Sequence, residues 1–256
     1  MTSKLLTRRS ALTGLIGGGS GILLSGCDRL VQIPGVLSML ESAEKLSEHG
    51  QRLVLRQTTP LAREYPRSEI SRNFKANGTT RPQGEEYARL AMSGFADYRL
   101  KVEGMVARPL DLSLAQIREL PSRTQITRHD CVEGWSAIGE WTGVPVSTLL
   151  QMAGVGNGSR YLVFHCADNL GGQGLYYESI DMVDAYHPQT IMAYAMNGQT
   201  LPIPHGAPLR LRVERQLGYK MAKYVMRIEV VDSFAKFGLG RGGFWEDQGY
   251  EWYAGI

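Results

Sequence analysis

The sequence predicts an α+β fold, with mixed β-sheets and short helices, over residues 61–256. Short segments alternate apolar and polar residues, as half-buried strands do, and the helical patterns between them are only a few turns long. Strands and helices do not follow one another in a regular βαβ array, so a Rossmann-type dinucleotide site is not indicated. The composition, 43% hydrophobic and 21% charged, is ordinary for a globular protein.

The first 27 residues have the pattern of an export signal. They contain Lys4, Arg8 and Arg9, no acidic residue, and a short glycine-rich apolar run. Arg8-Arg9 resembles a twin-arginine signal, and residues 24–27 resemble a lipobox that would attach a lipid anchor to Cys27. The alternatives are a general secretion signal and a plain cleavage site. We therefore expect a periplasmic or other extracytoplasmic protein, tethered to a membrane through Cys27.

The chain after this signal is balanced in charge, with 25 Lys and Arg against 25 Asp and Glu. Such a balance gives no footprint for binding nucleic acid through its phosphates. Residues 28–60 carry apolar residues three to four apart, which predicts a helical arm or tether. Residues 60–90 are rich in Pro, Arg, Asn, Gly and Thr and are predicted to be irregular and loop-rich.

The remaining elements follow in order from Tyr98. A helix is predicted over residues 112–120, with Ser113 near its start and Pro121 after its end. A strand leads into a loop that begins at Cys131, and a second helical stretch lies near residues 179–188. Further strands are predicted at 98–106, 161–168, 207–214 and 226–232.

Three cysteines, Cys27, Cys131 and Cys166, are neither a disulfide framework nor a zinc cluster, because none has CxxC spacing. Cys131 lies in HDCVEGWS, where a strand enters a loop, and a thiolate there is a soft ligand for a metal. His129 would lower the pKa of this thiol if both side chains lie on one face. A buried structural cysteine fits the chemistry equally well.

Two longer motifs favour the metal. RHDCVEGWS followed by WTGVPVSTLL resembles the molybdenum-binding loop of the sulfite oxidase superfamily. Downstream, HPQTIMAYAMNGQTLPIPHGAPLRLRV and LGYKMAKYV resemble the pterin-binding half of that family, in the same order. The resemblance covers roughly residues 70–235. Glu133 and Trp135 place the chain closest to the periplasmic methionine sulfoxide reductase catalytic-subunit branch.

This resemblance implies a site. Cys131 would be the protein ligand of the molybdenum in a molybdenum–molybdopterin cofactor, with Trp135 beside the metal. The pterin contacts implied are Asn73, Phe74, Asn77, His205, Arg210, Lys220 and Lys223, while Cys166 would line the pocket. A solvated strand face is the alternative for Arg210 and its neighbours Arg212 and Arg215. Further aromatic residues are candidates for the wall of the substrate pocket, although most are expected to be packing: Trp141, Tyr176, Tyr177, Trp245 and Trp252.

The implied reaction is oxygen-atom transfer coupled to electron transfer, with reduction of S-oxides or N-oxides as the main reading. Alternatives are a sulfite or other sulfur-compound oxidase, a non-catalytic exported lipoprotein, and a thiol hydrolase using Cys131 and His129. The sequence contains no CxxCH, so no haem is expected in this chain. Electrons would then come from a separate partner, a membrane b-type haem protein or a soluble cytochrome. The substrate would be a small-molecule or protein-bound oxide.

Overall fold

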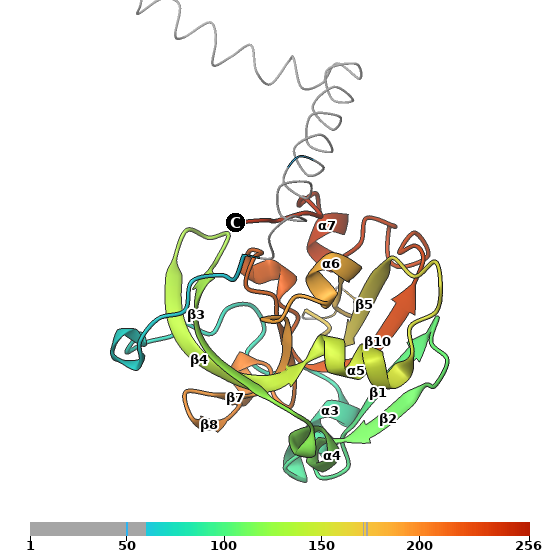
Figure 1. Cartoon of the computed structure of the whole chain (residues 1–256). Helices are drawn as coiled ribbons and strands as arrows, with labels where there is room; N and C mark the ends of the chain where they lie inside the picture. The colour runs from blue at the N-terminus through green and yellow to red at the C-terminus, as the bar shows by residue number, and fades with distance from the viewer. Residues whose placement is uncertain (1–49, 51–59, 171, 173) are drawn as a thin grey trace, which may run out of the picture. The chain divides into compact units, whose positions relative to one another are not determined.

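Two five-stranded β-sheets carry the fold (Figure 1). The computed structural model describes Gly50 and residues 60–170, 172 and 174–256. The predicted signal, with Cys27, and nearly all of the predicted arm lie outside the described residues. The residues from Pro60 onward form one compact unit.

The first sheet has the strand order β2-β1-β10-β5-β6. All of its pairs are antiparallel except β1 with β10, which run parallel. Along β1 the buried positions alternate with exposed ones, so this strand turns one face to the core, as its sequence predicts. The strands are β1 (Arg99–Gly104), β2 (Leu110–Ser113), β5 (Tyr161–Cys166), β6 (Tyr177–Asp181) and β10 (Val225–Val231).

The second sheet has the order β3-β4-β7-β8, and β9 also pairs with β7. Its longest pair is the hairpin of β3 and β4, which are in register from Arg123 opposite Gly143 to Asp130 opposite Ser136. This hairpin ends at the loop that contains Cys131. The strands are β3 (Arg123–Asp130), β4 (Ser136–Pro145), β7 (Ile191–Met196), β8 (Gln199–Thr200) and β9 (Arg210–Arg212).

From Pro60 onward the helices are short and connect the strands. At α4 the sequence signal is explicit, because Ser113 Oγ accepts from Gln116 N–H at 3.2 Å and Gln116 Oε1 accepts from Ser113 N–H at 2.9 Å. This reciprocal cap starts the helix where the sequence predicts. The α-helices in this part of the chain are α3 (Glu85–Met92), α4 (Leu114–Glu119), α5 (Val146–Ala153), α6 (Met182–Ala185) and α7 (Phe244–Asp247). The 3₁₀ helices are η1 (Arg67–Glu69), η2 (Ile203–His205) and η3 (Gly218–Lys220).

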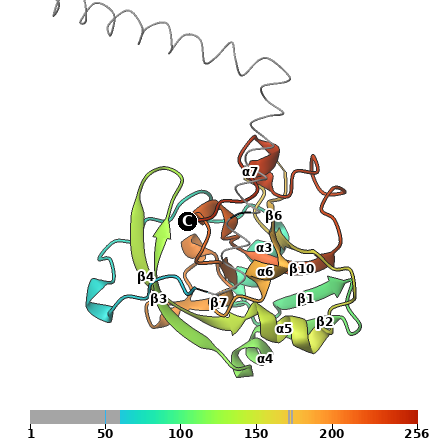
Figure 2. The same ribbon diagram turned by 45° about the horizontal axis from the view of Figure 1, so that its top comes forward.

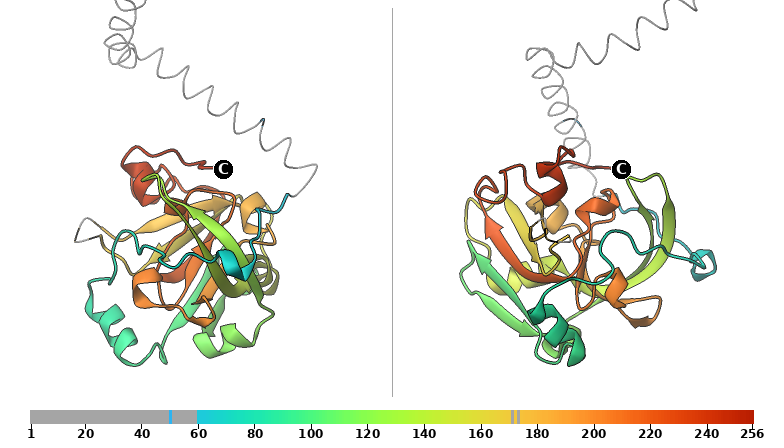
Figure 3. Two further views of the ribbon diagram at one scale, coloured as in Figure 1. Left: turned by 90° about the vertical axis from the view of Figure 1, so that its left-hand side faces the viewer. Right: turned by 180° about the vertical axis from the view of Figure 1, so that it is seen from behind.

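Side chains from both sheets meet in one hydrophobic core. Leu100 and Ile228 enter it from the first sheet, and Trp141 and Ile191 enter it from the second. In the view from behind, the red β10 and the yellow-green β3–β4 hairpin lie on opposite sides of the orange β7 region (Figure 3). The tip of the hairpin and α7 lie at the same end of the unit (Figures 1 and 2). Among the residues described, no helix combines the length and apolar character needed to cross a bilayer.

The predicted α+β class is confirmed, and three local predictions need correction. The loop-rich stretch 60–90 also contains η1 and most of α3. The helical stretch near residues 179–188 is a single short helix, α6, preceded by the end of β6. Residues 191–196 form a strand that the alternation of polarity did not indicate, because most of its side chains are buried on both faces.

Candidate functional site

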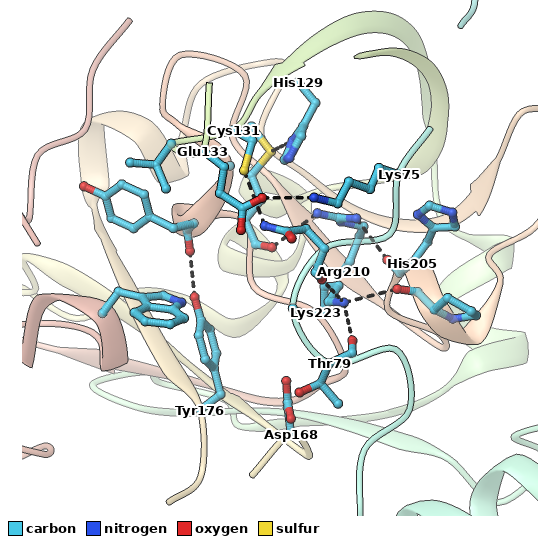
Figure 4. Close-up of a pocket in the computed structure, with 18 of the residues that line it drawn as sticks. Lys75, Thr79, His129, Cys131, Glu133, Asp168, Tyr176, His205, Arg210 and Lys223 are labelled. Carbon is cyan, nitrogen blue, oxygen red and sulfur yellow. Dashed lines mark hydrogen bonds and ion pairs between the residues drawn. The ribbon is translucent and has the colours of Figure 1, made fainter. Parts of the chain in front are cut away.

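A pocket of about 900 Å³, counting its open side, lies where the hairpin tip meets several loops. Figure 4 shows Cys131, Glu133 and Lys75 at one end of it, Tyr176 and Asp168 at the other, and Arg210 and Lys223 between. The lining comes from six parts of the chain: residues 74–79, 129–135, Asp168 with Leu170 and Tyr176, and residues 204–210, 218–223 and 245–250.

Cys131 is the first residue of the turn that joins β3 to β4. Its backbone N–H donates to Trp135 O at 2.9 Å, and the N–H of Gly134 donates to Cys131 O at 2.9 Å. The turn is therefore closed at the end of a long paired hairpin, and the thiol is held in place with only 8% of the residue exposed. Such a rigid base suits a residue that must present one atom to a bound group.

Burial raises the pKa of the Cys131 thiol, while hydrogen bonds, including one from Asn77 Nδ2 to Sγ at 3.4 Å, act in the opposite direction. His129 does not lower the pKa of the thiol, although the sequence suggested that it could. Burial and the charges of Arg212 and Arg210 hold the pKa of His129 well below its usual value, so its ring is neutral. Deprotonation of Cys131 would thus depend on a bound metal, which takes the thiolate form as its ligand.

The mouth of the pocket beside Cys131 is polar. Lys75 Nζ donates to Glu133 Oε2 at 3.2 Å, and Trp135 Nε1 donates to the same oxygen at 3.1 Å. These hydrogen bonds lower the pKa of Glu133. Trp135 lines the pocket, and its place beside a metal stays a prediction.

Phe74 packs the 74–79 loop against the hairpin. Its ring centroid lies 5.4 Å from that of Trp141, 5.5 Å from that of His129 and 5.6 Å from that of His205. These contacts bring Asn77, three residues further on, to the thiol.

Cationic side chains form the middle of the pocket. Arg210 is 5% exposed, its Nε has no hydrogen-bond partner, and burial together with the charge of Arg212 lowers its pKa to about 9. Both arginines lie over the Trp141 ring, with guanidinium carbons 5.0 and 4.4 Å from its centroid. The solvated strand face is therefore excluded for both. Arg212 is 0% exposed and already paired with Glu214 at 2.6 Å, so only Arg210 is available to a ligand.

Lys223 and His205 adjoin Arg210. Lys223 Nζ donates to the carbonyl oxygens of Asn77 at 2.7 Å, Thr79 at 2.5 Å and Pro204 at 3.1 Å, tying two loops together. Burial and the charge of Arg210 lower the pKa of Lys223 to about 7, and burial lowers the pKa of His205 to about 4. Gly206 (φ 111°) allows this packing, because a Cβ there would press on the side chains of Lys223 and Arg210.

Three predicted contacts lie outside the pocket lining. Lys220 is 0% exposed and pairs with Glu178 and Glu246, so its charge is already used within the protein. Cys166 is buried in the core, and its pKa is raised by that burial. Asn73 is exposed to solvent. The other predicted residues, Phe74, Asn77, Cys131, Trp135, His205, Arg210 and Lys223, are brought together around one cavity.

Several lining residues were not singled out from the sequence. Lys75 and Thr79 belong to the loop beside Phe74, and Asp168 follows β5. Tyr219 and Met221 flank Lys220. Trp245 was one of several aromatic candidates for the pocket wall, most of which were expected to be packing. A loop residue such as Asp168 carries no local sequence signal, because its place at the site depends on how distant segments pack. Tyr219 had a neighbouring signal, since the GYK turn was already implicated.

The donor set fits a molybdenum–pterin group. Among the residues described, no group of three or more His, Cys, Asp and Glu could hold a metal ion by itself. The chain instead offers one thiol beside a buried, incompletely paired arginine, a partly neutralised lysine and a histidine. Buried cations in this state favour an anionic partner. A metal that is bound to an anionic organic ligand needs few ligands from the protein, and its anionic ligand can pair with the buried cations.

An α+β domain with a buried thiol at one end of a cationic cavity is suited to hold an anionic cofactor that carries a metal. The family model of the oxidoreductase molybdopterin binding domain matches residues 88–236. The chain belongs to this family, and it is a molybdopterin-dependent oxidoreductase.

Several named proteins are similar to this chain. A protein of Azospira oryzae with the provisional name protein-methionine-sulfoxide reductase subunit YedZ1 is 38% identical over 98% of this chain and 89% of its own length. The protein-methionine-sulfoxide reductase catalytic subunit MsrP of Ralstonia nicotianae is 32% identical over 62% of this chain, which spans about half (51%) of that relative. The crystal structure of the sulfane dehydrogenase SoxCD from Paracoccus pantotrophus aligns with a TM-score of 0.49 and 27% identity, covering 54% of this chain and 39% of that one.

Proposed function

We propose that this chain reduces organic S-oxides to sulfides. The observation that carries the proposal is the Cys131 thiol at the end of a cationic pocket, in a chain whose relatives are named methionine-sulfoxide reductases. The overall reaction takes up two electrons and two protons per S-oxide and releases one sulfide and one water. Oxidation of sulfite or another sulfur compound is the same chemistry in the opposite direction.

When bound, the molybdenum–molybdopterin group supplies the two-electron redox change and accepts the oxygen atom. Cys131 would be the protein ligand of the molybdenum through Sγ. The hydrogen bond from Asn77 to Sγ favours the thiolate over the thiol. Arg210 and His205 would face the anionic part of the pterin, and its negative charge would raise the lowered pKa of Lys223.

The same residues fix the geometry. Lys223 holds the 77–79 loop against the 204–206 turn through three backbone carbonyls. Phe74 packs that loop on the hairpin that carries Cys131. A site assembled from segments braced in this way needs little reorganisation when substrate enters.

The direction of the reaction is tested on molybdenum-loaded protein. With a reduced viologen as donor, we expect consumption of electrons with dimethyl sulfoxide or trimethylamine N-oxide. With ferricyanide as acceptor, we expect little turnover of sulfite. The Cys131→Ala variant should lose molybdenum and turnover. Sulfite oxidation without S-oxide reduction would contradict the proposal. Wild-type protein purified from molybdenum-replete cells but containing no molybdenum would contradict the role of Cys131.

We further propose export by the twin-arginine route, a lipid on Cys27 and electron delivery by a separate membrane haem protein or soluble cytochrome. The support is the sequence of residues 1–27 and the absence of CxxCH from the chain. Mass spectrometry of the mature protein should find an N-terminal, lipid-modified Cys27. A Cys27→Ala variant recovered in the same membrane fraction would contradict the tether.

A further inference from the structure

The C-terminal segment, residues 237–256, forms one side of the pocket. The family match ends at residue 236, yet Trp245 and Tyr250 both line the cavity. α7 carries Trp245, and this helix lies at the same end of the unit as the hairpin tip with Cys131 (Figures 1 and 2). The side of the pocket that these residues form is therefore contributed from outside the matched domain.

These residues make a continuous aromatic surface with Tyr219. Trp245 and Tyr250 are stacked, with ring centroids 5.3 Å apart and an interplanar angle of 29°. Tyr250 meets Tyr219 edge to face at 5.2 Å. We call Tyr219, Trp245 and Tyr250 the aromatic wall. Tyr250 is 38% exposed, so the wall extends from the pocket to its rim.

The wall is fixed before any ligand arrives. Tyr219 Oη donates to Glu251 O at 2.6 Å, and Tyr177 Oη donates to Asp247 Oδ2 at 2.7 Å. Glu246 is 1% exposed and pairs with the buried Lys220. Because the segment is tied down at several points, a ligand that contacts it loses little free energy in ordering it.

An S-oxide has a polar part and an apolar part, and the pocket likewise has a polar end and an aromatic wall. Its S–O group is strongly polar, while the two carbon substituents on sulfur are apolar. The end of the pocket beside Cys131 carries the polar groups Lys75, Asn77 and Glu133, whereas the aromatic wall is suited to carbon. Sulfur with a partial positive charge is also attracted to aromatic rings.

Building on the proposed function, we infer that the aromatic wall selects the substrate. It binds the larger carbon substituent of an organic S-oxide whose oxygen points toward Cys131. The wall thereby favours S-oxides with a bulky apolar substituent over dimethyl sulfoxide. Trp245 and Tyr250 are the specificity-determining residues.

The test compares two substrates that share the S–O group, methyl phenyl sulfoxide and dimethyl sulfoxide, with molybdenum-loaded enzyme and a reduced viologen. Trp245→Ala should lower kcat/KM for methyl phenyl sulfoxide about tenfold, mainly through KM, because it removes apolar contact from the bound substituent. The value for dimethyl sulfoxide should change by less than about twofold. Tyr250→Ala, at the exposed rim, should show the same selectivity and serves if Trp245→Ala does not fold.

Leu239→Ala is the matched control, since Leu239 is 74% exposed on the same segment and does not line the pocket. It should leave kcat/KM unchanged for both sulfoxides. Equal losses with both sulfoxides, or no loss with either, would overturn the inference while leaving the proposed function in place. Loss of molybdenum from Trp245→Ala or Tyr250→Ala would show that the wall holds the cofactor instead. Wild-type enzyme that reduces neither sulfoxide would overturn the proposed function and the inference with it.

Discussion

Lys220 shows how the partners of a buried residue can escape sequence analysis. It stands in a turn that resembles a pterin contact, yet its ammonium group lies between the carboxyl groups of Glu178 and Glu246. Both partners are distant in sequence, 42 and 26 residues away. The lysine contacts Oε1 of each carboxyl group, and the buried Oε2 of each has no hydrogen-bond partner. One lysine cannot neutralise two buried carboxylates, so a proton on Glu178 completes the group.

Burial and the charge of Glu246 raise the pKa of Glu178 well above its usual value of 4.5. A raised pKa in the folded state means that the folded protein keeps this proton while the unfolded chain releases it above about pH 4.5. The contribution of Glu178 to stability is therefore complete below that pH and declines as the pH rises.

We expect Glu178→Gln to remove this decline. The free energy of unfolding of wild type minus that of the variant should be largest near pH 4. This difference should become smaller by pH 7. Urea unfolding of cofactor-free protein at several pH values measures the difference. Glu103→Gln, which removes a partly exposed carboxylate paired with Arg227, is the control. An advantage of wild type that grows with pH would contradict the protonated state of Glu178.

At the scale of elements, the sequence predicts what is locally encoded. Ser113 and Gln116 form the cap of α4. Along β3, buried residues alternate with more exposed ones, and this alternation identifies the face toward the core. β7 was missed because IMAYAM has no alternation, as expected for a strand covered on both faces. In the site, the motifs around Cys131 and Arg210 were informative. The contributions of Lys75, Asp168 and Trp245 depend on packing between distant segments and leave no local pattern.

The contact between η3 and β3 offers a test at the same scale. A Cβ on Gly218 would overlap the ring of His129 on β3, so glycine is what allows the two elements to approach. We expect Gly218→Ala to lower the free energy of unfolding by about 1–3 kcal/mol, as overpacking usually does, and to reduce molybdenum content.

A double-mutant cycle separates this overlap from other effects. Combined with His129→Ala, the added methyl group would enter vacated space, so the double variant should be more stable than the sum of the single changes predicts. Thermal unfolding of all four cofactor-free proteins measures the coupling. Simple additivity would show that Gly218 is not needed for the approach of η3 to His129.

At the scale of the whole molecule, the site is assembled from both sheets and from the C-terminal segment. The hairpin of the second sheet supplies Cys131, the loop after β5 of the first sheet supplies Asp168, and residues beyond β10 supply Trp245 and Tyr250 of the aromatic wall. Cofactor binding should therefore stabilise the entire unit, because a ligand that binds only the folded state shifts the unfolding equilibrium of all that holds it.

Arg210 and Arg212 separate what the fold needs from what the cofactor needs. They lie two residues apart on β9 and contact the same Trp141 ring, but only Arg212 is paired, with Glu214. Replacing Arg212 with Met leaves a carboxylate buried without its cation, which costs roughly 3–5 kcal/mol in comparable cases. Replacing Arg210 with Met removes a buried charge that has no acidic partner.

We therefore expect opposite patterns from the two variants. Cofactor-free Arg210→Met should stay within about 1 kcal/mol of wild type, since the relief of its burial offsets the lost hydrogen bonds to His205 O and, at 3.5 Å, Met221 O. It should nevertheless retain much less molybdenum. Arg212→Met should be strongly destabilised even without cofactor. Urea unfolding of the cofactor-free proteins, with metal analysis of freshly purified ones, tests both. Equal destabilisation, or full molybdenum content in Arg210→Met, would mean that the positive charge of Arg210 serves the fold and not the cofactor.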